Sequence, residues 1–167
     1  MITKIFRRGN GETVNYEQMV DVITDYIAKE PNSSYEITVG TDSQNHSKTK
    51  MVEVIAIHRV GDGGIFFYRT EYIRKIKVLK EKIVEETSRS LENATGLVDN
   101  IGVKLIDHDI DIDELDIHFQ IHCDIGKYGK TSQLISEITS WVEAAGYEAV
   151  IKPDSYTASG IANKISK

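Results

Sequence analysis

The stretch that decides the fold runs from Leu115 to Asp124 and reads LDIHFQIHCD. Apolar and polar residues alternate along its whole length, and a period of two predicts a β-strand with one buried face. The segments on both sides of it switch between strand and helix patterns. The sequence therefore predicts a sheet that is covered by helices.

The segments before this strand predict one helix, three strands and further helical sequence. The predicted elements are a helix at 16–29, a strand from 35 that ends in GTDSQ at 40–44, a polar loop at 45–50, hairpin strands at 51–60 and 65–73, a helix from about 75 to 94, a further helix at 96–106 and an acidic loop after it. The turn of the hairpin, at 61–64, reads GDGG, which is a strong turn signal.

The segments after it predict a loop at 126–130, a helix at 131–145 that ends at Gly146, a short strand at 148–151 and a terminal helix at 159–167. After the first helix the order is three strands, then helix, strand, helix, strand, helix. This is the element order of the ribonuclease H-like fold, an α/β fold with a mixed sheet. We expect about five strands with helices on both faces, in one domain of 1–167 with an N-terminal helical extension (1–34) and a core (35–167).

The composition excludes several classes of protein. A chain of 167 residues with a single cysteine cannot be a disulfide scaffold. Its longest apolar runs are four residues, at 54–57 and 65–68, so neither a membrane span nor a secretory signal is expected. We expect a soluble, cytoplasmic protein.

The net charge of −6 argues against a nucleic-acid partner at first, but the charges are unevenly placed. Six carboxylates fall within 107–116, a segment without Lys or Arg. Six Lys and Arg side chains cluster within 69–82 against only two Glu. A locally basic rim on an acidic protein is compatible with phosphate contacts, although a solvated helix face gives the same pattern.

Two aspartates follow predicted strands that are neighbours and parallel in this topology. Asp42 lies at the end of the strand that begins at 35, and Asp124 lies at the end of the strand that decides the fold. Two carboxylates at one end of a sheet repel each other unless a cation neutralises them, and oxygen ligands suit Mg²⁺ or Mn²⁺. The alternative is that each aspartate caps the turn after its strand. Their joint occurrence favours a metal site.

A third carboxylate is expected from the helix at 75–94, which carries Glu81, Glu85, Glu86 and Glu92. Glu86 continues the apolar face at helical spacing, whereas Glu85 lies at its exposed edge. A carboxylate on the buried face is the best candidate for a ligand. The alternative is a boundary residue whose stem packs while its carboxylate reaches water.

Four ordered motifs resemble those of the YkuK-type ribonuclease H-like family. They are GTDSQ at 40–44, ET with SLE at 86–92, HCDIG with GKT at 122–131, and KPDSY with AS at 152–159. The resemblance covers 35–167 and implies a nuclease related to ribonuclease H. The family pattern has an acidic residue near the C-terminus where this chain has Asn163.

These observations predict a metal-dependent nuclease acting on RNA, DNA or a hybrid. Asp42, Glu86 and Asp124 are the expected ligands of Mg²⁺ or Mn²⁺, and Asp154 competes with Asn163 for the fourth position. The expected substrate-binding residues are Ser43, Gln44, Lys130, Lys152 and Ser155. The alternative is a non-catalytic domain of the same fold that binds nucleic acid or a protein partner.

Overall fold

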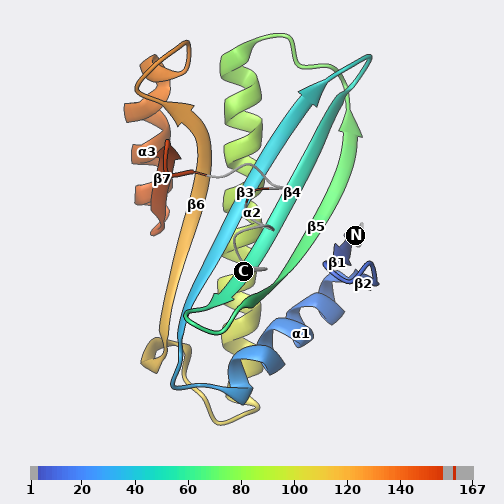
Figure 1. Cartoon of the computed structure of the whole chain (residues 1–167), viewed down its shortest axis with the longest axis vertical. Coiled ribbons are helices and arrows are strands. Elements are labelled where there is room, and N and C mark those ends of the chain that lie inside the picture. Colours follow the sequence, from blue (N-terminus) through green and yellow to red (C-terminus); the bar gives the residue numbers. More distant parts are fainter. Residues whose placement is uncertain (1–3, 156–159, 161–167) are drawn as a thin grey trace.

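Seven strands form one mixed sheet in the order β2-β1-β5-β4-β3-β6-β7 (Figure 1). The structure is a computed structural model that describes residues 4–155 and residue 160. Its strands are β1 (Ile5–Arg8), β2 (Thr13–Asn15), β3 (Ser34–Asn45), β4 (Thr49–Arg59), β5 (Gly64–Ile73), β6 (Asp116–Gly126) and β7 (Glu148–Lys152). Its α-helices are α1 (Tyr16–Lys29), α2 (Leu79–Ile106) and α3 (Ile135–Ala144), with short 3₁₀ turns at Ile112–Glu114 and Ser132–Leu134.

The central strands have the predicted mixed directions. β3 runs antiparallel to β4 and parallel to β6, and β6 runs parallel to β7. The α/β fold class is therefore confirmed, and the predicted order of elements holds as far as β7. β3 is longer than predicted, because its pairing with β4 continues through GTDSQ to the pair Asn45–Thr49. The predicted loop at 45–50 shrinks to a turn at 46–48.

The N-terminal segment adds two strands that the sequence did not predict. β1 and β2 form a hairpin, and β1 pairs with β5, which raises the strand count from about five to seven. Strands of four and three residues are too short to show a clear period of two. Helix α1 follows with the predicted bounds, because Asn15 and Gln18 cap its N-terminus reciprocally.

Helix α2 is one continuous helix of 28 residues, so the predicted break near residue 95 is wrong. Gly96 lies inside it because a glycine fits against α1: a Cβ at this position would meet the Tyr16 hydroxyl at 2.9 Å. Asn100 reinforces the contact by donating to both the Tyr16 hydroxyl and the Gly96 carbonyl. Close packing of two helices explains this glycine better than a helix end does.

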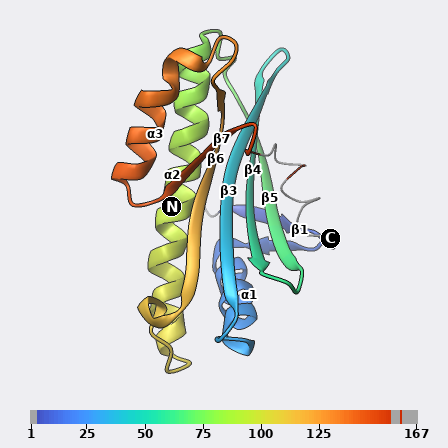
Figure 2. The ribbon, with the colours of Figure 1, turned by 60° about the vertical axis from the view of Figure 1, so that its left-hand side comes forward.

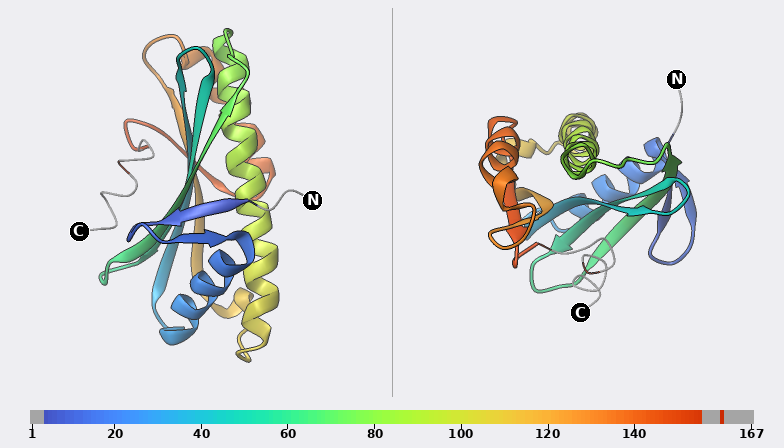
Figure 3. Two further views of the ribbon diagram at one scale, coloured as in Figure 1. Left: turned by 90° about the vertical axis from the view of Figure 1, so that its right-hand side faces the viewer. Right: turned by 90° about the horizontal axis from the view of Figure 1, so that it is seen from above.

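The three described α-helices all lie on one face of the sheet, and not on both faces as the sequence predicted, because they share one hydrophobic core (Figures 2 and 3). One hydrophobic core joins residues of α1, α2 and α3 to the inner sides of the central strands. A smaller cluster around Val54 and Ala56 lies on the opposite face. The terminal helix predicted at 159–167 falls outside the described residues, apart from Gly160. None of the described helices has the length and apolar character needed to cross a membrane.

Candidate carboxylate site

Asp42 and Asp124 occupy equivalent places on two neighbouring parallel strands. The pairing of β3 with β6 ends at Gly40 and His122, and each aspartate lies two residues beyond its strand's last paired residue. Beyond that point the ribbons of β3 and β6 diverge (Figure 1). Side chains two residues apart share a face, so both carboxylates project from the same face where the strands separate.

The sequence predicted that Asp42 lies at the end of its strand, and the structure shows that it does not. It pairs with Val52 of β4 inside the long β3–β4 hairpin, and β3 continues to Asn45. The residues of GTDSQ are mostly polar, but backbone pairing with β4 keeps them extended. What ends beside Asp42 is the pairing of β3 with β6.

The two neighbours of Asp42 point toward α2. The Thr41 hydroxyl lies 2.8 Å from the Ser90 hydroxyl of α2, and the Ser43 hydroxyl donates a hydrogen bond to Oε2 of Glu86. Alternation along the strand therefore directs Asp42 to the opposite face, away from α2. Glu86 approaches the separated strands from the helix side, and the two aspartates project from the other side.

Burial makes Glu86 an unusual carboxyl group. Its side chain is 4% exposed, and the loss of hydration raises its pKa to about 7. Among the smaller effects, the hydrogen bond from Ser43 and the positive charge of Lys82 lower this pKa. The negative charges of Asp124 and Asp42 raise it. The sensitivity of one carboxyl to both aspartates indicates that the three groups form one electrostatic cluster.

The second oxygen of Glu86, Oε1, is buried without a hydrogen-bond partner in the described part of the chain. A buried carboxylate oxygen without a partner is costly, because it has lost its hydration without compensation. A buried glutamate with one such oxygen, repelled by two aspartates, belongs to a donor set that fits a hard cation. The residues of the site therefore fit Mg²⁺ or Mn²⁺ in their chemistry.

The donors are not gathered into a finished metal site. Among the described residues, no three His, Cys, Asp or Glu side chains are placed so that they can hold one ion. Asp124 instead forms an ion pair, because Nζ of Lys152 lies 2.8 Å from its Oδ1 and neutralises its negative charge. Any cation that uses Asp124 has to compete with this ion pair.

The position of Lys152 depends on a close approach between β6 and β7. Gly126 pairs with Lys152 after a register shift in β6, and a Cβ at Gly126 would meet Cβ of Lys152 at 2.9 Å. A side chain at position 126 would thus push Lys152 away from Asp124. The sequence predicted Lys152 as a substrate-binding residue, but it could not predict the ion pair with Asp124, because that pair depends on this register shift.

The other glutamates of α2 lie away from the cluster. Glu85 accepts from Nε of Arg89 at 2.9 Å, Glu81 is exposed, and Glu92 is largely exposed beside Lys4. The structure thus places Glu86 on the buried face of α2, as its helical phase indicated, and places Glu85 elsewhere.

Of the predicted substrate-binding residues, Ser43 and Lys152 touch the cluster, and the rest do not. Gln44 is exposed one residue further along β3, and Lys130 is exposed in the turn after β6. Asp154 is exposed just after β7 and Ser155 is partly buried; the amide of each donates to the Ile151 carbonyl. Asn163 lies outside the described residues.

His122 is a residue whose burial the sequence did not predict. The alternating pattern of β6 assigned it to an ordinary polar face, yet it is only 7% exposed. It shares the face of Asp124, and together with Asp154 it lines a hollow of about 440 Å³ beside β7. Its burial comes from this long-range packing, for which the strand period carries no signal.

A second charged cluster lies under α2, between the helix and strands β4 and β5. Glu53 is fully buried there and accepts hydrogen bonds from Arg69, Arg89 and Asn93. Both arginines also pair with Glu71, whose pKa their hydrogen bonds and charges lower although partial burial acts to raise it. This cluster is neutralised internally, so Arg69 does not belong to the basic rim that the sequence predicted.

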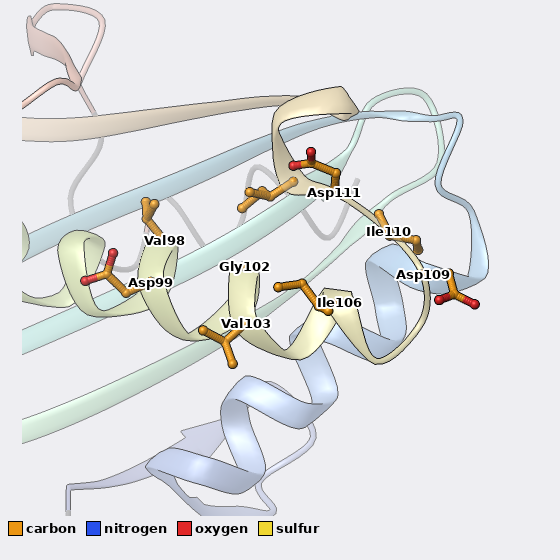
Figure 4. A pocket seen from close by; sticks show the side chains of 9 residues that line it. Val98, Asp99, Gly102, Val103, Ile106, Asp109, Ile110 and Asp111 are labelled. Carbon is orange, nitrogen blue, oxygen red and sulfur yellow. The ribbon is translucent and has the colours of Figure 1, made fainter.

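A hollow of about 640 Å³ lies near the C-terminal end of α2 (Figure 4). Its wall is mainly apolar, with Val98, Val103 and Ile106 among the lining residues. Gly102 in its floor lies 16 residues beyond Glu86, or about 24 Å along the helix axis at ~1.5 Å per residue. This hollow is therefore separate from the carboxylates.

Comparison with known proteins gives two matches over most of the chain. A family model described as ribonuclease H-like matches residues 18–167. The chain is 36% identical over 165 residues to the uncharacterized protein YkuK of Bacillus subtilis (strain 168), and the match covers 92% of each chain. No solved structure matches the chain significantly.

Proposed function

Because the chain belongs to the ribonuclease H-like family, we propose that it is a metal-dependent nuclease that hydrolyses phosphodiester bonds of RNA, DNA or a hybrid. One observation carries this proposal: Glu86 is buried with a raised pKa, one of its oxygens has no hydrogen-bond partner among the described residues, and the charges of both Asp42 and Asp124 act on it. A cluster of carboxylates that is unfavourable by itself is the arrangement that a cation stabilises.

Asp42, Glu86 and Asp124 are the residues that would hold Mg²⁺ or Mn²⁺. Such ions, when bound, polarise a phosphoryl oxygen and lower the pKa of water. Glu86 has to lose its proton to bind a cation. The Ser43 hydroxyl already occupies Oε2, so Oε1 is the oxygen that would bind the cation. Lys152, released from Asp124, would offer its positive charge to a phosphate.

A non-catalytic nucleic-acid-binding domain is the second candidate function. The ion pair between Lys152 and Asp124 favours it, because this pair satisfies one carboxylate without any metal. In that case the fold would be retained and the carboxylates would have no catalytic role.

Cleavage assays distinguish the two functions. Labelled single-stranded, duplex and hybrid substrates are incubated with Mn²⁺ and the wild-type protein, Asp42→Asn, Glu86→Gln or Glu85→Gln. We expect cleavage by wild type and Glu85→Gln, and its loss in the other two variants. Nucleic-acid binding without cleavage and without a need for Mn²⁺ would overturn the nuclease proposal. Cleavage that survives Asp42→Asn would overturn the assignment of the catalytic site to these carboxylates.

A further inference from the structure

An aromatic side chain stands exposed on the same face of the sheet as the two aspartates. Tyr72 of β5 is 61% exposed and pairs with Lys50 of β4. Their neighbours Met51 and Glu71 point toward α2, since Met51 is fully buried and Glu71 binds Arg89 of that helix. Alternation therefore directs Lys50 and Tyr72 to the face opposite the helices.

The strand register places Tyr72 close to Asp42. Asp42 pairs with Val52, and Val52 pairs with Thr70, which lies two residues before Tyr72 on β5. Two strand spacings of ~4.8 Å and two residues of ~3.4 Å give a separation of about 12 Å. At a rise of ~3.4 Å per nucleotide, this is the length of three to four stacked bases.

A basic segment, residues 74–77 of the β5–α2 connection, follows Tyr72 in the chain. Lys48 of the β3–β4 turn and Arg74, Lys75 and Lys77 of the β5–α2 connection are exposed around an open hollow of about 740 Å³. Glu81 is the single acidic residue in its wall. Within residues 4–155 and 160, none of these four cations has an ion-pair partner.

Hydrogen bonds hold this basic segment against the hairpin. The side-chain amide of Asn45 donates to the Ile76 carbonyl at 3.0 Å, and the Ile76 amide donates to the Thr49 hydroxyl at 2.9 Å. The Thr49 hydroxyl in turn donates to Asn45 at 2.6 Å. The basic segment is thus fixed in place next to the end of the strand that carries Asp42.

We propose that this surface binds a single-stranded stretch of nucleic acid next to the carboxylate site, with a base stacked on Tyr72 and the phosphates on Lys48, Arg74, Lys75 and Lys77. The inference rests on the proposed function for the class of ligand and extends it to the kind of strand. An exposed ring beside a basic track is the arrangement that proteins use for unpaired strands, because stacking requires a base that is free of its partner. A duplex contacts the phosphate-binding cations but leaves the tyrosine unused.

Fluorescence anisotropy in EDTA tests this surface without cleavage, using labelled single-stranded and duplex oligonucleotides. We expect Tyr72→Ala to weaken single-strand binding about five- to 150-fold and to leave duplex binding unchanged. Tyr72→Phe keeps the ring and should bind within about twofold of wild type. The triple variant Arg74→Ala, Lys75→Ala, Lys77→Ala should make the negative slope of log K against log salt shallower by about 2 for a single strand.

The matched control is Lys29→Ala, which removes an exposed charge at the C-terminal end of α1, and it should bind as wild type does. Equal weakening of single-strand and duplex binding by Tyr72→Ala, or no weakening, would overturn the inference. So would a triple variant that behaves like Lys29→Ala. Cleavage that persists together with such a result would leave the nuclease proposal standing, whereas the expected binding without any cleavage would overturn only the nuclease.

Discussion

The Ser43 hydroxyl on β3 donates a hydrogen bond to Oε2 of Glu86 on α2, while Oε1 of the same carboxyl is buried without a partner in the described residues. One half of this carboxyl is thus held in place, and the other half is left for a ligand or a proton. The pKa of about 7 follows from this burial, with added repulsion from Asp124 and Asp42.

The first prediction concerns pH and stability in the presence of a chelator. The pKa of Glu86 is about 7 in the folded protein against 4.5 for the free group, so the folded state holds its proton more tightly. Stability therefore falls as pH rises from about 4.5 to 7, by about 3 kcal/mol at most, and this contribution is constant outside that window. Glu86→Gln cannot titrate and should lack this fall, as urea unfolding across pH 4 to 8 would show.

Glu85→Gln is the control for this prediction, because Glu85 lies next to Glu86 but forms an ion pair with Arg89 at the edge of the helix. Its unfolding free energy should follow the pH dependence of the wild type through the same window. Parallel curves for wild type and Glu86→Gln would contradict the assignment of the raised pKa.

The second prediction concerns Lys152. Its ammonium group competes with a cation for Asp124, so Lys152→Met should bind Mn²⁺ more tightly in calorimetry. Both side chains are about half exposed, at 54% and 46%, so solvent weakens their pairing and the gain should stay below about tenfold. Lys127→Met, in the exposed loop after β6, is the control. Weaker Mn²⁺ binding by Lys152→Met would mean that the lysine supports the site instead of competing with it.

The third prediction concerns the fourth ligand position. Asp154 follows β7, near the end of the sheet where Asp124 projects, and it shares a hollow with His122. Asp154→Asn should weaken Mn²⁺ binding, and Asn163→Asp should change it little. Glu148→Gln, at the opposite end of β7, is the control. A gain of affinity or of activity in Asn163→Asp would instead assign the position to residue 163.

Periodicity and turn chemistry in the sequence were enough to predict the central part of the fold. The alternation in 115–124 and the GDGG turn both depend on neighbours in the chain, and the structure has the elements they predict. The ribonuclease H-like family, inferred from four motifs, is confirmed as well. The N-terminal hairpin was missed because its strands are short, and the break in α2 was wrong because Gly96 packs against Tyr16.

The candidate site was predictable only in part, because local sequence patterns do not encode how separate elements pack. Helical phase placed Glu86 on the buried face, and strand order put Asp42 and Asp124 on neighbouring parallel strands. The Ser43–Glu86 hydrogen bond and the Lys152–Asp124 ion pair depend on how separate elements pack, which no local pattern encodes.

The fourth prediction concerns the charged cluster that joins α2 to the sheet. Glu53→Gln should destabilise the protein by about 3 kcal/mol, because it leaves Arg69 and Arg89 largely buried without their shared carboxylate. Glu12→Gln, which removes an exposed ion pair with Arg8, should cost no more than about 1 kcal/mol. Denaturant unfolding measures both. A loss below about 1 kcal/mol for Glu53→Gln would mean that the cluster is not the main electrostatic link between helix and sheet.

Calorimetric titration with Mn²⁺ is the most direct test of the central claim, that Asp42, Glu86 and Asp124 form one cation-binding site. We predict binding to the wild-type protein and its loss in the double variant Asp42→Asn, Asp124→Asn. The double variant should stay folded and, without metal, be at least as stable as the wild type, because removing like charges relieves repulsion on Glu86. Equal Mn²⁺ binding by the two proteins would contradict the claim.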